Sequence, residues 1–215
     1  MASKAPFLPL LKEALTLSPW SHLELSTKQE ESLAFIIKEL QRWNRTFSFT
    51  SLIHPRDLVE VFVLDSLAPL ALGIEIPSPL LDAGCGTGFP SLPLKIAQPS
   101  LEIVAVDSSR KKINFVRHVV RLLKLQGYTP RQGRLEDLRK EGASFPGVTV
   151  RALTGKDALA LVATLVSPGG KAILYVGKEW SPRSLPPGLG IEKHLTYALP
   201  FSGKVRGLVL ATRVV

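Results

Sequence analysis

The segment LLDAGCGTGFP, residues 80–90, constrains the fold of this chain more than any other. Two leucines lead into Asp82, and glycines follow at every second position, at Gly84, Gly86 and Gly88. Glycine adopts backbone angles that other residues avoid and lets a ligand approach the main chain closely. A buried strand followed by such a loop and a helix is typical of a nucleotide-like site at the carboxyl ends of a parallel sheet.

Downstream of this loop, short apolar runs alternate with helical patterns. Such alternation predicts an α/β fold with a mostly parallel sheet and helices on both faces. The last two apolar runs flank a Ser-Gly-Lys turn, which predicts an antiparallel hairpin at one edge of the sheet. We expect strands at 80–83, 101–106, 128–133, 147–151, 170–176, 191–200 and 205–213, and helices at 90–97, 109–125 and 157–166, with a short helix before 147.

Two helical patterns precede the first strand. Ser26 and Gln29 have the spacing of a capping box at the start of a helix that runs to residue 44. Pro55 is suited to the first turn of a second helix. We therefore expect residues 1–78 to form a helical cap packed on a core of residues 79–215, which would be a single compact unit.

Composition restricts the environment and the chemistry. The chain contains one cysteine, which excludes an internal disulfide framework and gives no sign of a metal cluster. No run of about 18 apolar residues is present, so a membrane span is not expected. The N-terminal stretch lacks the pattern of a signal peptide. We expect a cytoplasmic, monomeric protein without a metal.

Positive charge is concentrated in one part of the chain. The net charge is +9, and the stretch from 108 to 135 holds eight Lys or Arg residues and no Asp or Glu. Basic groups displace counterions from phosphates, so nucleic acid is the natural partner of such a stretch. A solvated helix face that happens to be basic is the alternative, and charge alone leaves both open.

The spacing of the glycines helps to choose the ligand. A dinucleotide fold requires G-x-G-x-x-G, whereas this loop reads G-x-G-x-G. Asp107 ends the next strand, where a carboxylate can accept both hydroxyls of a ribose. Asp82 can orient the loop or face a cationic ligand. A ribose, an amino group and a sulfonium without a phosphate describe S-adenosylmethionine; a tight turn whose glycines serve packing is the alternative.

Several motifs together resemble a known family. They are DAGCGTGFP at 82–90, AVDSSRKK at 105–112, WNRTFSFTS at 43–51, VLDSL at 63–67, GRLEDL at 133–138, VRAL at 150–153 and LPFSGKVRGLVL at 199–210. This set is similar to the GidB/RsmG family of bacterial small-subunit ribosomal RNA methyltransferases. The resemblance implies a Rossmann-like class I methyltransferase sheet. It also implies transfer of a methyl group from S-adenosylmethionine to N7 of a guanine in 16S rRNA, either free or in the small ribosomal subunit.

The resemblance also implies individual site residues. Leu135 and Glu136 match the pair beside the adenine, and Arg151 matches an arginine at the mouth of the methyl-transfer pocket, which makes it the candidate catalytic residue. The residues expected to bind the cofactor are Asp82, Gly84, Gly86, Gly88, Phe89, Asp107, Ser108, Leu135, Glu136 and Arg151. Those expected to contact RNA are Arg110, Lys111, Arg117, Arg134, Lys178 and Arg206.

The chain departs from the family pattern at a few positions. These are Val61 and Phe62 in place of Arg-His, Ser48 in place of asparagine, Ser91 in place of glycine and Gly207 in place of histidine. Because they spare most of the glycine loop, they bear on the target nucleotide more than on methyl transfer. Another RNA site, a small-molecule substrate and a non-catalytic RNA-binding protein on the same fold remain alternatives.

Overall fold

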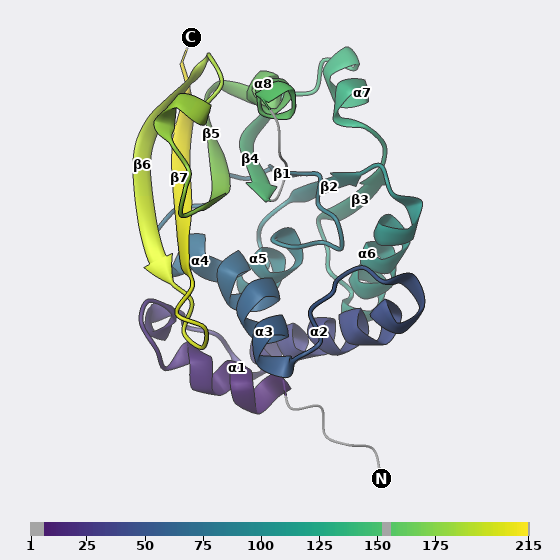
Figure 1. Ribbon diagram of the computed structural model, residues 1–215. Coiled ribbons are helices and arrows are strands. Elements are labelled where there is room, and N and C mark those ends of the chain that lie inside the picture. Colours follow the sequence, from purple (N-terminus) through teal and green to yellow (C-terminus); the bar gives the residue numbers. More distant parts are fainter. Residues whose placement is uncertain (1–6, 152–155, 215) are drawn as a thin grey trace.

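A computed structural model describes residues 7–151 and 156–214. Within these ranges seven strands form one sheet in the order β3-β2-β1-β4-β5-β7-β6 (Figure 1). β1 to β5 run parallel, and β7 pairs antiparallel with both β5 and β6. The predicted α/β architecture and its edge hairpin are thus confirmed. The strands are β1 (Leu80–Ala83), β2 (Ile103–Asp107), β3 (Tyr128–Gln132), β4 (Phe145–Arg151), β5 (Val166–Gly177), β6 (Leu189–Ala198) and β7 (Val205–Arg213).

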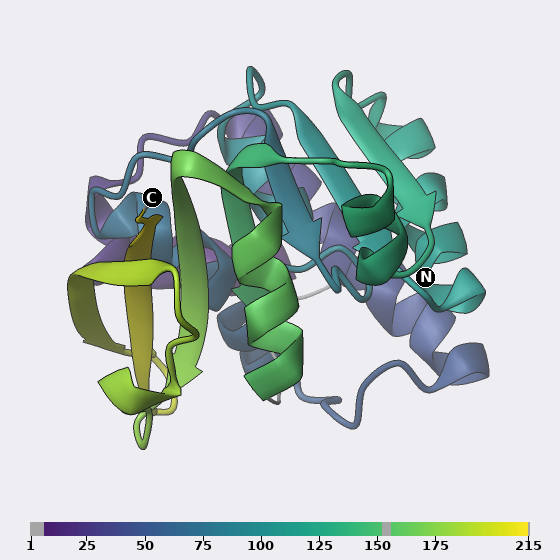
Figure 2. The ribbon, with the colours of Figure 1, turned by 90° about the horizontal axis from the view of Figure 1, so that it is seen from above.

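Helices cover both faces of the sheet. Figures 1 and 2 show α7 and α8 on one face and α4, α5 and α6 on the other, with α1 and α2 as a further layer outside them. None of the helices in the described ranges is both long and apolar enough to cross a membrane. The helices are α1 (Phe7–Leu15), α2 (Thr27–Phe47), α3 (Pro55–Leu58), α4 (Asp65–Ala71), α5 (Ser91–Ala97), α6 (Arg110–Leu123), α7 (Leu135–Lys140) and α8 (Lys156–Leu165).

Each face of the sheet has its own apolar core. Leu80 belongs to the core shared with the N-terminal helices, whereas its neighbour Leu81 belongs to the core under α7 and α8. This division follows from the alternation of side chains along a strand. The indole of Trp20 is fully buried in the first core and donates a 2.9 Å hydrogen bond to the carbonyl of Leu64. The N-terminal helices therefore share a continuous core with the sheet.

The two predicted N-terminal helices are present, and one of them is irregular. Ser26 caps α2 through the predicted capping box with Gln29. The second helix begins at Pro55 as expected, but after α3 it widens into a π-helical segment, Val59–Leu64, before α4 continues it. The sequence predicted a regular helix here. A single π-helical turn moves only a few side chains to another face, so the apolar spacing still looks like that of an α-helix.

The start of β5 differs from the prediction. The sequence predicts a strand at 170–176, whereas β5 begins at Val166 and includes the turn-like stretch Ser-Pro-Gly-Gly at 167–170. The pairing with β4 shifts register between Phe145 and Gly147, and Gly169 takes a φ of +72°. A bulge of this kind lets proline and glycine lie within a strand.

Candidate functional site at the carboxyl ends of the strands

The glycine loop makes a tight turn from β1 into α5. Gly84, Gly86 and Gly88 all have positive φ angles, of 74°, 56° and 82°. A Cβ atom added at Gly86 would meet nothing within 4 Å, whereas one at Gly88 would lie 2.6 Å from Cδ1 of Leu92. Gly86 therefore faces open space, and Gly88 is required by packing against α5.

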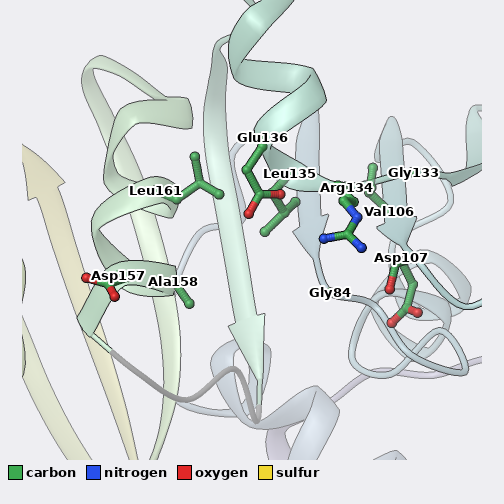
Figure 3. A pocket seen from close by; sticks show the side chains of 11 residues that line it. Gly84, Val106, Asp107, Gly133, Arg134, Leu135, Glu136, Asp157, Ala158 and Leu161 are labelled. Atoms are coloured by element: carbon green, nitrogen blue, oxygen red, sulfur yellow. The ribbon is translucent and has the colours of Figure 1, made fainter.

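A cavity of about 590 Å³ opens beside this loop. It lies between the carboxyl ends of β1 and β2 and the first turns of α7 and α8 (Figure 3). The structure brings together five of the predicted cofactor residues here, and Arg134, predicted as an RNA contact, joins them. The lining residues are Gly84, Val106, Asp107, Ser108, Gly133, Arg134, Leu135, Glu136, Asp157, Ala158 and Leu161.

The carboxylate of Asp107 ties the loop to the next strand. Its Oδ2 accepts a 2.9 Å hydrogen bond from the backbone N–H of Gly86, and its Oδ1 accepts a 2.8 Å bond from that of Ser109. Each carboxylate oxygen can accept more than one hydrogen bond, so both retain capacity for a ligand hydroxyl. Asp107 thus shapes the loop and can still bind.

Asp82 lies beneath the glycine loop and is not one of the residues that line the cavity. Its carboxylate is 1% exposed, and Oδ2 accepts hydrogen bonds from the hydroxyl and the backbone N–H of Ser91. The serine that departs from the family's glycine therefore holds this carboxylate. Oδ1 has no hydrogen-bond partner among the described residues. Burial raises the pKa of Asp82 to about 7.

Cys85 is a small buried residue of the turn. Its side chain is 1% exposed, and burial raises the pKa of its thiol well above the usual value. A thiol held in its neutral form is a poor nucleophile. The structure therefore gives Cys85 a packing role.

Arg151 lies at the end of β4 and points away from the cavity, among whose lining residues it does not occur. Its guanidinium donates to the carbonyl of Val61 and the hydroxyl of Ser66, at 2.6 and 3.1 Å. The guanidinium carbon is 5.9 Å from the ring centre of Phe62, and that ring lies 4.9 Å from the ring of Phe89. A continuous contact therefore runs from the glycine loop through Phe62 to Arg151.

The predicted RNA contacts are divided between two parts of the molecule. Arg110, Lys111 and Arg117 are exposed on α6, which packs beside β2 and β3. Lys178 is exposed after β5, and Arg206 on β7 is one-third exposed, with its Nε 3.9 Å from Asp65 Oδ1. Strands β1 and β4 separate the two groups in the sheet.

Sequence reasoning missed the contribution of α8. Asp157, Ala158 and Leu161 line the cavity opposite Leu135 and Glu136 (Figure 3). The four-residue spacing of 157 and 161 puts both on one helix face, but nothing in their chemistry marks them as ligand contacts. In the parts of the chain that the structure covers, no group of three or more His, Cys, Asp or Glu side chains is arranged to hold a metal ion.

A family model and individual relatives that match this chain carry the same description. A family model described as rRNA small subunit methyltransferase G matches residues 29–182. The ribosomal RNA small subunit methyltransferase G of Geobacter sp. (strain M21) is 35% identical over 200 residues, which cover 89% of this chain and 92% of that protein. Its counterpart from Syntrophotalea carbinolica is 37% identical over 195 residues, covering 85% and 88%.

Solved structures with low sequence identity share the fold. A mutant of MtNAS in complex with S-adenosylmethionine superposes with a TM-score of 0.58 at 14% identity, covering 99% of this chain and 93% of that one. TrmN from Thermus thermophilus gives a TM-score of 0.57 at 18% identity, covering 69% of this chain and 48% of that one.

Proposed function

Because the chain belongs to the rRNA small subunit methyltransferase G (GidB) family, we propose that it transfers a methyl group from S-adenosylmethionine to N7 of a guanine in 16S rRNA. The cavity beside the glycine loop carries this proposal, because Gly84 of the loop lines it together with Asp107, whose carboxylate keeps acceptor capacity for a ligand. We further propose that the enzyme acts as a monomer in the cytoplasm, where its proposed rRNA substrate is found.

The residues present fit S-adenosylmethionine. The carboxylate of Asp107 would accept hydrogen bonds from the ribose hydroxyls, and the apolar side chain of Leu135 would lie against the adenine with Glu136 near its polar edge. Asp82 does not line the cavity, so its buried Oδ1, which has no hydrogen-bond partner in the described residues, would reach the cationic methionine end through a water. Unpaired buried acceptors of this kind need a partner. The cofactor would supply the methyl group as an electrophile.

Guanine N7 suits a site with this residue set. The nitrogen carries a lone pair at neutral pH, so no general base has to remove a proton before it attacks. Among the described residues that line the cavity there is no histidine. Alignment of the nucleophile with the electrophile can account for a large rate factor by itself. Phe89 and Arg151 are the groups that we place beside the target base.

The basic residues would position the RNA. Arg110, Lys111 and Arg117 extend from the start of α6 along its exposed side, and Arg134 stands at the rim of the cavity. Contacts of this type fix register on the phosphate backbone and do not read sequence. The groups around the end of β4 would therefore select the target nucleotide.

Labelled S-adenosylmethionine and small ribosomal subunits that lack the modification test this function. We expect one methyl group per subunit, mapped by chemical cleavage to N7 of a single guanine. A parallel reaction with free 16S rRNA shows whether the enzyme methylates the free RNA or only the assembled small subunit. Label on another atom, or binding of RNA without any transfer, would refute the proposal.

A further inference from the structure

The end of β4 carries a group of buried polar contacts centred on one carboxylate. Asp65, directly after the π-helical segment, is 4% exposed. Its Oδ2 lies 3.3 Å from Nη2 of Arg151. Its Oδ1 accepts a 2.6 Å hydrogen bond from the hydroxyl of Tyr197 and lies 3.9 Å from Nε of Arg206. Both carboxylate oxygens are therefore engaged, one of them by the candidate catalytic arginine.

Two further acceptors hold the same guanidinium. The carbonyl of Val61 and the hydroxyl of Ser66 accept from the two terminal nitrogens of Arg151. Ser66 is fixed in turn, because its hydroxyl donates to the carbonyl of Phe62 and its carbonyl accepts from Tyr175, both at 2.7 Å. A planar guanidinium with acceptors on both terminal nitrogens has a single orientation.

The π-helical segment explains why these acceptors converge. Hydrogen bonds in a π-helix join residues five apart, one more than in an α-helix. The last bond of this segment runs from the N–H of Asp65 to the carbonyl of Glu60, so the widened turn reaches the first residue of α4. Val61 within the segment, and Asp65 and Ser66 directly after it, all contact Arg151 at the end of β4. Single π-helical turns are frequent at functional sites.

We propose that Asp65 is a positioning residue for methyl transfer. Its buried carboxylate, with Val61 and Ser66, holds the guanidinium of Arg151 in the orientation that the reaction requires. The role of Asp65 rests on the function proposed above. The π-helical segment also carries Phe62, whose ring contacts Phe89 of the glycine loop. The segment therefore fixes the place of Arg151 relative to the cofactor cavity.

Asp65→Asn tests this role, because it keeps the shape of the side chain and removes its charge. With unmodified small subunits as substrate, kcat should fall about tenfold or more, since misplaced catalytic groups cost rate. The Kd for S-adenosylmethionine should stay within about threefold, because Asp65 does not line the cavity. Wild-type kcat in this variant would overturn the inference.

Glu60→Gln is the matched control. Glu60 is 1% exposed in the same π-helical segment, and its Oε1 accepts from the N–H groups of Phe201 and Ser202, at 2.6 and 2.9 Å. It makes no hydrogen bond or ion pair with Arg151 in the described structure. We expect kcat within about twofold of wild type, because the amide oxygen can still accept both bonds. A fall equal to that of Asp65→Asn would show a general structural effect and overturn the inference.

A double-mutant cycle with Arg151→Lys separates positioning from stability. If Asp65 acts through Arg151, then Asp65→Asn should lower kcat by less than about twofold in the Arg151→Lys background, because coupled residues are not additive. Full additivity would overturn the inference. If the Asp65→Asn variant does not fold, Tyr197→Phe is tested in its place, and its kcat should fall about two- to fivefold. An inactive wild-type protein would refute the proposed function and the role of Asp65 with it.

Discussion

The cofactor cavity and the Arg151 cluster both lie at the carboxyl ends of the parallel strands, but they are assembled differently. The Arg151 cluster comprises Arg151, Val61, Asp65, Ser66, Tyr175, Tyr197 and Arg206. The cavity takes Gly84 from the turn after β1, Asp107 from the end of β2 and Leu135 from the start of α7, which follows β3. The cluster joins the π-helical region to β4, β6 and β7, and its bond from Tyr197 to Asp65 spans 132 positions of the chain. The first site is a series of local motifs, and the second exists only when distant segments pack together.

The two regions also differ in how far their polar groups are satisfied. Beside the cavity, Asp107 keeps spare acceptor capacity and Asp82 Oδ1 has no partner in the described residues. In the cluster, both oxygens of Asp65 are occupied by groups of the protein itself. A site that awaits a ligand leaves polar atoms unpaired, whereas a site that orients a side chain closes its network.

The largest effect on ligand binding is expected in the locally built site. Gly86→Val fills the open space above the loop, so the affinity for S-adenosylmethionine should fall about 100-fold or more, which is about 2.7 kcal/mol. Gly73→Val is a matched control, since Gly73 also has a positive φ, of 69°, and open space around its Cβ position. Calorimetry should show loss of binding only at Gly86; equal affinity in both variants would contradict the placement of the ligand.

Asp82 makes the loop region sensitive to pH. Burial raises its pKa from 3.8 to about 7, so the folded protein binds this proton more tightly than the unfolded chain does. The free energy of unfolding should therefore fall between about pH 4 and pH 7, by at most about 4 kcal/mol, and then level off. Asp82→Asn should lose most of this dependence in urea unfolding at several pH values. A variant with the wild-type pH profile would show that another group titrates.

In the Arg151 cluster, single hydrogen bonds should have graded effects on stability. Tyr197→Phe removes a bond to a carboxylate, which should lower the free energy of unfolding by about 1.5 to 3 kcal/mol. Tyr175→Phe removes a bond to the neutral carbonyl of Ser66, which should cost about 1 kcal/mol. Urea unfolding of both variants measures the difference. A larger loss for Tyr175→Phe would mean that the charge of Asp65 contributes little.

The smallest effect is expected on the basic face of α6. Lys111→Ala should weaken binding to small subunits by about threefold or less and lower the slope of log affinity against log salt by about 1. Lys193→Ala, exposed on β6 at the opposite edge of the sheet, should change neither. Filter binding at several salt concentrations measures both. Equal effects of the two substitutions would argue against α6 as the RNA-facing side.

Much of the fold could be predicted because each element is encoded in a short stretch. The capping box at Ser26, the apolar runs of β1 and β2 and the turn between β6 and β7 all act over a few residues. The start of β5 could not be predicted, since proline and glycine at 168–170 usually end a strand. Here they form a bulge between Val166 and Lys171, which both pair with β4.

The same contrast between local sequence signals and long-range packing applies to the candidate site. Asp107 could be placed at the site because the carboxyl ends of parallel strands meet there, whereas Glu136 was placed by the resemblance of its motif to a known family. The direction of Asp82 could not, since a hydrogen bond from Ser91 beneath the loop decides it. Asp157 on α8 and Tyr197 on β6 carried no local signal, because their roles depend on what packs opposite them.

By itself, the sequence determined the alternation of strands and helices, the open glycine loop and the acidic residue at the end of β2. These follow from backbone freedom and hydrophobic periodicity, which act between near neighbours. Only the tertiary structure decided that Arg151 turns away from the cavity toward Asp65 and that Asp82 is buried with one oxygen unpaired. Burial and hydrogen-bond partners are properties of the packed molecule, since they depend on groups that the chain brings together from far apart.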